Sequence, residues 1–294
     1  MKIKFKYLPY LIIFGLAIIW GSSFILMKRG MECYSSGQVA AMRLFIAFLC
    51  LYPFIIYKTK NIKKEQWKYL IASGFLGNGI PAFLFTYAET GISSSLAGIL
   101  NSLTPLFTLI VGFFLFKSKV IRINVLGVII GFAGTAWLLF SLPGSKMHAD
   151  VSYALLVILA TLCYAFSVNI IKTHLHGLDS ILISGAALIV VGPLCGIYLC
   201  FTDVVSRSLT NPLALSSFIY VLILGVMGTA VSLLYFNKLI KMSSALFASS
   251  TTYFIPVVAV FWGMADHENM GYRQLVAMAV ILSGMYLINK KHGE

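Results

Sequence analysis

Charged residues are scarce in this sequence. Only 11% of its 294 residues are Asp, Glu, Lys or Arg, whereas 60% are hydrophobic, and the mean hydropathy is +0.93. In a soluble domain about a quarter of the residues are charged. So few charges cannot cover a water-facing surface, and the polar residues gather between apolar runs of roughly 20 residues, the length that crosses a bilayer as a helix. The composition therefore excludes a soluble domain and indicates an integral membrane protein.

The apolar runs define ten predicted membrane spans. They lack the strict alternation that a membrane β-barrel requires, and helices satisfy their own backbone hydrogen bonds in lipid. The predicted fold class is therefore all-α and integral to the membrane, and the short connections leave no room for a separate soluble domain. The spans are expected at residues 8–27, 39–57, 67–87, 96–116, 120–142, 152–171, 181–201, 216–236, 245–265 and 272–289.

The predicted spans also lack the groups that carry most intramembrane chemistry. No Asp or Glu lies deep in a span, and the five histidines all fall in connections or in the tail. No Gly-x-Ser-x-Gly or His-Glu-x-x-His motif occurs, and the five cysteines form no Cys-x-x-Cys pair. These absences weigh against an intramembrane enzyme, a built-in proton relay, a disulfide framework and a metal site. We expect no cofactor.

The net charge of +13 is distributed by membrane side. With the N-terminus inside, sixteen Lys and Arg fall on the inner side, five on the outer side, and Arg43 lies within a span. This is the positive-inside pattern, so the basic character reflects topology and not a nucleic-acid partner. The outer five are Lys28, Arg29, Lys146, Arg207 and Arg273.

The second half of the chain repeats features of the first. Residues 69–112 align with residues 220–263 at a constant shift of 151, and the stretch at 20–28 aligns with 164–172 at a shift of 144. Each half holds an odd number of spans, five, so the second half enters the membrane from the opposite side. We therefore predict two inverted five-helix repeats, 1–142 and 143–294, within one membrane domain. Matching residues include Gly74 with Gly225, Gly77 with Gly228, Phe85 with Phe236, Pro105 with Pro256, Trp20 with Tyr164 and Ser23 with Ser167.

Four stretches of the sequence have the character of a known family. They are "WGSSFILMK" at 20–28, "AAMRLFIAFLCL" at 40–51, "SSSLAGILNSLTPLFTLIVGFFLF" at 93–116 and "LGVIIGFAGTAWLL" at 126–139. These stretches resemble EamA-type members of the drug/metabolite transporter superfamily. The resemblance covers essentially the whole chain and implies ten helices and the export of a metabolite. The sequence departs from the family pattern at Lys117, where Gly-Glu often follows the fourth span, and at Tyr164, where Trp is frequent.

Polar and aromatic residues that recur at mid-span depth are the candidates for a central cavity. Inverted repeats place the substrate site near the midplane, where the two halves meet. Packing between helices is the alternative role for the serines, and interhelical hydrogen bonding is the alternative for the two asparagines. The candidate substrate-binding residues are Trp20, Ser23, Asn78, Asn101, Tyr164, Ser167, Thr229, Tyr235, Thr252 and Tyr253.

Two prolines and two charged residues complete the candidate set. Pro105 and Pro256 lie mid-span and are candidate hinges, with static bending of the helix as the alternative. Arg43 is a candidate for charge or coupling because a basic residue within a span is costly, although its long stem could reach the interface. Glu89, at the outer end of the third span, is the second such candidate, with a solvated cap as the alternative.

Composition and repeats by themselves predict a polytopic carrier, and the resemblance implies an inner-membrane permease that exports its solute. We expect it to move a small organic metabolite, an amino acid or a similar amphipathic solute, outward by alternating access. The alternatives are an intramembrane enzyme and a membrane receptor or scaffold. The expected partners are the solute and the lipid bilayer, and the sequence leaves a homo-oligomer open.

The charge distribution predicts that both termini are cytoplasmic. A reporter that is active only in the cytoplasm should be active when fused after Glu294, because an even number of spans returns the chain to the inner side. Strong activity from a periplasmic reporter at the same position would contradict this topology.

Overall fold

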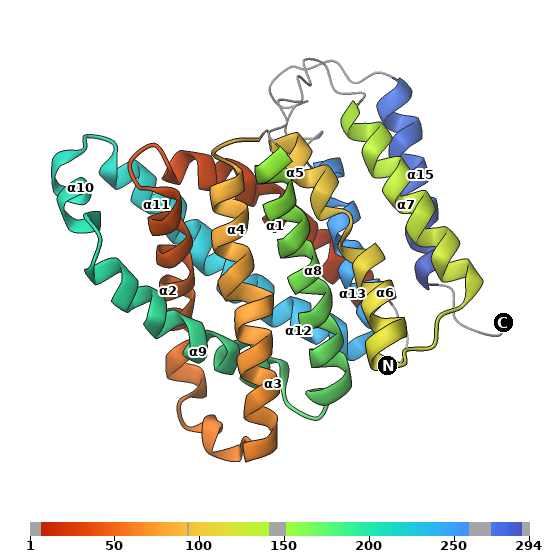
Figure 1. The fold of residues 1–294 in the computed structure, drawn as a ribbon, viewed down its shortest axis with the longest axis horizontal. Helices are drawn as coiled ribbons and strands as arrows, with labels where there is room; N and C mark the ends of the chain where they lie inside the picture. The colour runs from red at the N-terminus through yellow and green to blue at the C-terminus, as the bar shows by residue number, and fades with distance from the viewer. Residues whose placement is uncertain (1–6, 93, 141–150, 259–271, 290–294) are drawn as a thin grey trace.

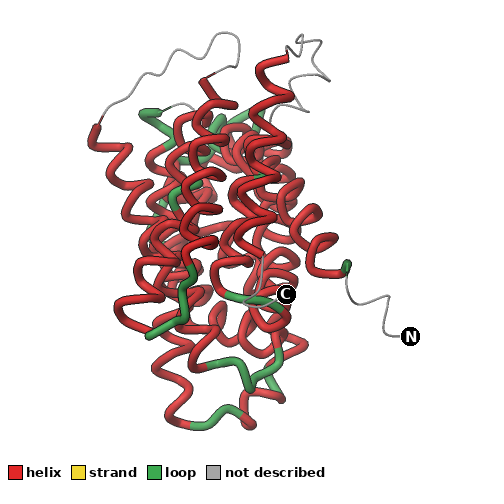
Figure 2. Tube along the Cα trace, turned by 90° about the vertical axis from the view of Figure 1, so that its right-hand side faces the viewer, coloured by secondary structure: helices red, strands yellow, loops and turns green. Residues whose placement is uncertain are grey.

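The structure is a computed structural model that describes residues 7–92, 94–140, 151–258 and 272–289. All regular elements in these ranges are helical, as the sequence predicts, and the main helices run roughly side by side (Figures 1 and 2). The predicted boundary between the repeats, at 142/143, and both chain ends lie outside the described residues. The principal elements of the first half are α1 (Leu8–Gly30), α2 (Ser36–Ile55), α3 (Lys64–Gly74), η3 (Phe75–Gly79), α4 (Ile80–Ala88), α5 (Ser94–Asn101), α6 (Thr104–Phe116) and α7 (Arg122–Phe140).

The second half is also made of helices. It contains α8 (Val151–His174), α9 (Ser180–Cys200), α10 (Val204–Thr210), α11 (Ala214–Gly225), η4 (Val226–Val231), α12 (Ser232–Met242), α13 (Ala245–Ser249), η5 (Ser250–Tyr253) and α15 (Tyr272–Asn289). Two short elements in connections, α10 and η2 (Lys58–Asn61), were not predicted from the sequence.

Six helical stretches are long and apolar enough to cross a membrane. They are Leu8–Gly30, Ser36–Ile55, Lys64–Ala88, Val151–His174, Ser180–Cys200 and Ala214–Met242. Four shorter apolar helices accompany them, at Thr104–Phe116, Arg122–Leu138, Ala245–Val258 and Leu275–Ile288. These helices fall within the predicted spans or extend them by a few residues, while the last part of the span at 245–265 lies outside the described residues. The chain is therefore a helical, multi-pass membrane protein.

Local sequence explains where several helices begin. At the start of α2, the Ser35 hydroxyl accepts from the Gln38 backbone N–H at 3.3 Å, and the Gln38 side chain accepts from the Ser35 N–H at 2.8 Å. This reciprocal pair is a capping box. Ser244 caps α13 in a similar way, by accepting from the Phe247 N–H. Such caps satisfy backbone donors that have no partner inside the helix.

Two of the long helices contain a wide π turn at matching places. In the first half η3 joins α3 to α4, and in the second half η4 joins α11 to α12. Their first residues, Phe75 and Val226, are separated by the shift of 151 residues found in the sequence. A π turn disturbs the regular ladder of helix hydrogen bonds and frequently occurs at functional sites.

The two mid-span prolines start new helical segments. Residues 102–103 form a turn between α5 and α6, and Pro105 then lies in the first turn of α6. In the second half, η5 and Phe254 precede the helical turn that contains Pro256. A proline fits the first turn of a helix because its missing N–H has no partner there anyway. The sequence predicts a kink inside a continuous helix at each proline. In the structure, the helix is instead interrupted before each proline.

Glycines allow the closest approaches between the helices. A Cβ added at Gly284 of α15 would lie 2.5 Å from the Gly131 nitrogen and 2.8 Å from the Gly127 carbonyl oxygen of α7. Figure 1 shows these two helices side by side at one edge of the bundle. Because backbone atoms cannot move aside as a side chain can, this contact requires a residue without a side chain. Small residues serve the same purpose in other membrane helix pairs.

Related glycine contacts join the two halves. A Cβ at Gly74 would lie 2.8 Å from the Ala187 carbonyl oxygen on α9, and a Cβ at Gly225 would lie 3.1 Å from the Arg43 carbonyl oxygen on α2. The two glycines are matched by the shift of 151, and Arg43 and Ala187 by the shift of 144. The contacts between the halves therefore follow the sequence repeat.

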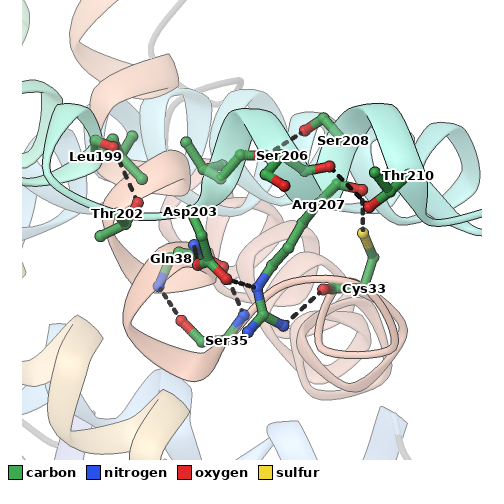
Figure 3. Close-up of polar contacts among 11 residues, drawn as sticks. Cys33, Ser35, Gln38, Leu199, Thr202, Asp203, Ser206, Arg207, Ser208 and Thr210 are labelled. Atoms are coloured by element: carbon green, nitrogen blue, oxygen red, sulfur yellow. Dashed lines mark hydrogen bonds and ion pairs between the residues drawn. The ribbon is translucent and has the colours of Figure 1, made fainter.

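A polar cluster joins the α1–α2 connection to α10 at one end of the bundle (Figure 3). Arg207 donates from Nε to Asp203 Oδ2 at 2.8 Å and from Nη1 to the Cys33 carbonyl at 3.3 Å, while Gln38 Nε2 donates to Asp203 Oδ1 at 2.7 Å. The Arg207 guanidinium holds the pKa of the Asp203 carboxyl below its usual value. The cluster therefore anchors the linker between α9 and α11 to the start of α2.

The contact between α7 and α15 generates a prediction. Gly284→Ala should lower the free energy of unfolding in detergent by about 1–3 kcal/mol, because the added methyl group overlaps backbone atoms of α7. Gly15→Ala is the matched control, since a Cβ there meets nothing within 4 Å and alanine is the better helix former. Thermal unfolding of both variants measures the difference. Equal stability of the two variants would contradict the close contact.

Candidate functional site

A central cavity of about 140 Å³ lies between the two halves of the chain. Residues from α1, α2, α3, η3 and α4 line it together with residues from α8, α9, η4 and α12, and segments around α5–α6 and α13–η5 complete its wall. Eight of the ten predicted substrate-binding residues are among its lining residues: Trp20, Ser23, Asn78, Asn101, Tyr164, Ser167, Thr229 and Thr252. Trp20, Asn78, Asn101 and Tyr164, which the sequence repeat singles out, lie in the wall of this one cavity.

Two matched aromatic pairs contribute to the wall. Trp20 meets Phe236 edge-on, with ring centroids 5.1 Å apart, and donates from Nε1 to the Gly228 carbonyl at 3.2 Å. Tyr164 stacks on Phe85 with centroids 5.9 Å apart. The members of these pairs correspond through the sequence repeat. In each pair, an aromatic ring from the first helix of one half packs against a phenylalanine of the other half. The four rings contribute to the apolar surface of the cavity.

Hydrogen-bonding side chains interrupt this apolar surface. Asn78 lies in η3, and its counterpart Thr229 lies in η4, so both belong to the wide turns. Asn101 lies at the end of α5, where its Oδ1 accepts from the Thr104 hydroxyl at 3.4 Å. Thr252 lies in η5 and donates to the Ser249 carbonyl at 3.1 Å. The irregular segments therefore bring polar groups to the cavity.

The two predicted serines have structural partners. The Ser23 hydroxyl donates to the Ile19 carbonyl at 2.9 Å, and the Ser167 hydroxyl donates to the Ser73 carbonyl at 3.4 Å. A Cβ at Gly228 would lie 3.1 Å from Ser23 Oγ, and a Cβ at Gly77 would overlap Ser167 Oγ. These contacts give both serines a packing role in addition to their place in the wall.

The structure does not bring Tyr235 and Tyr253 to the cavity. Tyr235 is 49% exposed on α12, whereas Tyr253 is fully buried, packs against Gly131, and donates its hydroxyl to the Val128 carbonyl at 3.0 Å. Tyr253 therefore stabilises the contact of η5 with α7. The sequence indicated that both were aromatic residues in spans but not which face of the helix each occupies, so these two expectations are corrected.

Arg43 lies about two turns into α2 and lines the cavity. Its Nε donates to Thr229 Oγ1 at 3.2 Å, and its Nη1 lies 3.7 Å from Met27 Sδ. Both partners are on other helices, α1 and η4. The side chain therefore points into the bundle and does not extend to the membrane interface.

Glu89 is buried, which corrects its interpretation as a solvated cap. It lies one residue beyond the helical stretch Lys64–Ala88, its side chain is 6% exposed, and neither carboxyl oxygen has a hydrogen-bond partner among the described residues. Burial raises the pKa of Glu89 to about 8, against the opposing influence of Lys28 and Arg43. The carboxyl group is therefore mostly protonated at neutral pH.

Sequence reasoning missed Asn237 as a lining residue. It follows directly after the predicted span at 216–236, but α12 continues to Met242, and Asn237 lies in the cavity wall with 1% of its surface exposed. The signal was available because Asn237 matches Thr86 through the shift of 151. Asn237 was left out because the predicted span ends one residue before it.

Similar proteins are known among membrane transporters. An uncharacterized inner membrane transporter of Escherichia coli, YedA, is 25% identical over 287 residues, which cover 94% of this chain and 89% of the relative. An uncharacterized transporter of Archaeoglobus fulgidus is 27% identical over 92% of this chain and 95% of its own length. YoaV of Bacillus subtilis, also described as an uncharacterized transporter, is 25% identical over 94% of both chains.

A solved crystal structure has the same fold. It superposes with a TM-score of 0.73 and 18% sequence identity, and the match covers 95% of both chains. The sequence profile described as "EamA-like transporter family" matches the chain twice, at residues 8–140 and 151–290. Together these two matches cover nearly the whole chain. The protein therefore belongs to the EamA-like transporter family.

Proposed function

We propose that this protein is an inner-membrane permease that exports a small organic metabolite by alternating access. The observation that carries the proposal is the central cavity, whose wall is built from corresponding residues of both halves. Trp20 and Tyr164 illustrate this correspondence, as do Asn78 and Thr229. The wall combines aromatic rings with hydroxyl and amide groups, a surface that suits an amino acid or a similar amphipathic solute.

The proposed permease consists of two inverted five-helix repeats, 1–142 and 143–294, which the repeat in the sequence supports. Both termini are proposed to lie in the cytoplasm, which the distribution of Lys and Arg supports. In transporters of this architecture, one repeat moves against the other around a fixed midplane site. Matched glycine contacts at Gly74 and Gly225 provide the surfaces along which the halves meet. The interruptions before Pro105 and Pro256 are the proposed hinges, because a helix break absorbs a change of direction at little cost.

Family membership favours this function over the alternatives from other classes. The relatives are described as transporters, which points to a protein that moves a solute without transforming it. The solute and the bilayer are the partners that the proposal requires.

Measurement of flux tests the proposal. We expect the purified protein in proteoliposomes to exchange internal radiolabelled amino acid for external unlabelled amino acid, in a panel that covers aromatic, aliphatic and polar side chains. Tyr164→Ala should lower this exchange at least about tenfold, since loss of one aromatic contact with a solute removes on the order of 1.4 kcal/mol. Tyr235→Ala is the matched control, because Tyr235 lies outside the cavity and half-exposed on α12. Equal flux in both variants would contradict the cavity as the transport site.

Replacement of Glu89 tests coupling and the effect of burial. We expect substantial flux to survive in Glu89→Gln at neutral pH, because glutamine resembles the protonated carboxyl group that burial favours.

The same variant tests the effect of burial on stability. A raised pKa of Glu89 in the folded state means that the wild type loses stability as the pH rises from 4.5, the ordinary pKa of the group, to about 8. Glu89→Gln should lack this loss, roughly 2–5 kcal/mol, in thermal unfolding between pH 5 and pH 9.

The control for this experiment is Glu32→Gln, which removes an acid that forms an exposed ion pair with Arg29. It should leave the pH dependence of stability nearly unchanged. Complete loss of flux in a normally folded Glu89→Gln protein, together with loss of the pH dependence of transport, would instead indicate proton coupling through Glu89.

A further inference from the structure

Arg43 is the sole charged side chain among the described residues that line the cavity. Every other lining residue is apolar, aromatic, or carries a neutral hydroxyl or amide group. A cation in a medium of low polarity is costly unless a counter-charge or several hydrogen bonds compensate it. The groups that compensate the charge of Arg43 therefore determine which charge a solute in the cavity should carry.

The partners inside the protein do not neutralise Arg43. Its guanidinium carries five N–H donors, yet its hydrogen-bond partners are the Thr229 hydroxyl and the Met27 sulfur, both uncharged. The two ion pairs of the described residues are Arg29–Glu32 and Arg207–Asp203, and neither involves the cavity. Donors of Arg43 thus remain available for an anionic group.

Glu89 does not supply the missing counter-charge at neutral pH. Its carboxyl oxygens accept no hydrogen bond from Arg43 or from any other described residue, and its carboxyl group is mostly protonated because burial raises its pKa to about 8. Glu89 is also absent from the described residues of the cavity wall. An anion that enters the cavity would therefore be the direct counter-charge of Arg43.

Asn237 contributes a buried acceptor to the cavity wall that has no hydrogen bond among the described residues. Asn237 donates from Nδ2 to Ser184 Oγ at 2.8 Å, and the Ser184 hydroxyl in turn donates to the Ser180 carbonyl at 2.8 Å. With its hydrogen donated to Ser180, the Ser184 oxygen accepts from the Asn237 amide nitrogen, which leaves Asn237 Oδ1 without a donor from Ser184. Asn237 Oδ1 is then a buried acceptor without a hydrogen bond among the described residues. Such an atom requires a donor, which a solute can provide.

Arg43 and Asn237 contact the same helical stretch at different levels. Asn237 follows Thr229, the partner of Arg43, by eight residues along η4 and α12, which corresponds to roughly 12 Å along the helix axis. The aromatic pairs Trp20–Phe236 and Phe85–Tyr164 belong to the same wall.

We propose that the cavity recognises an amphipathic monocarboxylate, whose carboxylate group pairs with Arg43 and whose far end donates a hydrogen bond to Asn237 Oδ1. The proposal rests on the permease function proposed above and names the substrate class of that site. A carboxylate accepts two parallel N–H bonds from a guanidinium. One arginine balances one negative charge, whereas a phosphate dianion would leave a charge uncompensated in the cavity. The apolar body of the acid would lie against the aromatic rings.

The test compares three ligands on the wild-type protein in nanodiscs by calorimetry: 3-(4-hydroxyphenyl)propionate, its primary amide, and its 4-methoxy analogue. The amide keeps the shape of the acid and removes the charge, while the methoxy compound keeps the charge and removes the far donor. We expect the amide to bind about 10- to 100-fold more weakly than the acid, and the methoxy compound about tenfold more weakly, as for loss of a charged and a neutral hydrogen bond.

Two variants assign these differences to their residues. Arg43→Gln should abolish the preference for acid over amide and retain the preference for hydroxyl over methoxy, whereas Asn237→Leu should do the reverse. Arg29→Gln is the control for removal of a positive charge, since Arg29 lies in an exposed ion pair outside the cavity wall, and it should retain both preferences. If Arg43→Gln does not insert, the comparison of acid and amide on the wild type still decides the proposal.

Several outcomes would overturn the carboxylate site. They are equal affinity for acid and amide, no binding of the acid up to about 10 mM, or an acid preference that persists in folded Arg43→Gln. Flux of the same acid in proteoliposomes separates this proposal from the permease function. Selective binding without flux would contradict the permease and retain the site, whereas flux of uncharged solutes that is indifferent to Arg43→Gln would retain the permease and overturn the site.

Discussion

The exclusion of water from the bilayer interior constrains every polar group of this chain. A backbone or side-chain group in the hydrocarbon region must find its partner within the protein or in a bound molecule. Helices meet this requirement for the backbone, and the Trp20 indole and the Tyr253 hydroxyl meet it by donating to carbonyl groups of neighbouring segments. In the cavity, Arg43 retains N–H donors, and Asn237 retains an acceptor oxygen, that have no hydrogen-bond partner among the described residues. The constraint that specifies the fold thus also supports the solute site proposed here.

Close backbone approach is the second determinant of the architecture. Gly284 meets the backbone of α7, while Gly74 and Gly225 meet the backbones of α9 and α2. Hydrophobic burial gives little drive for association between helices in lipid, so packing of small residues contributes more there than in water. The wide turns η3 and η4 follow directly after Gly74 and Gly225. Close packing and irregular, polar helix geometry therefore occur together beside the cavity.

The two halves of the sequence have matching glycine and aromatic positions but different polar side chains at other corresponding positions. Ala187 occupies in the second half the position that Arg43 occupies in the first, and Thr86 corresponds to Asn237. The matched glycines and aromatic pairs preserve the shape of the cavity, whereas the unmatched polar residues make its two sides distinct. An asymmetric solute, with a charged end and a hydrogen-bonding end, fits such an asymmetric wall.

The sequence by itself determined the class of protein, the position of the helices, and most of the cavity. Composition and apolar run length follow from the thickness of the bilayer, and the repeat identified Trp20, Asn78, Asn101 and Tyr164 as neighbours of one cavity. Tertiary structure decided which face of a helix each side chain occupies, because a helix that is apolar on most of its circumference gives little periodicity from which the buried face can be predicted. It therefore removed Tyr235 and Tyr253 from the cavity, added Asn237, and buried Glu89, since helix rotation and length depend on packing against neighbouring helices.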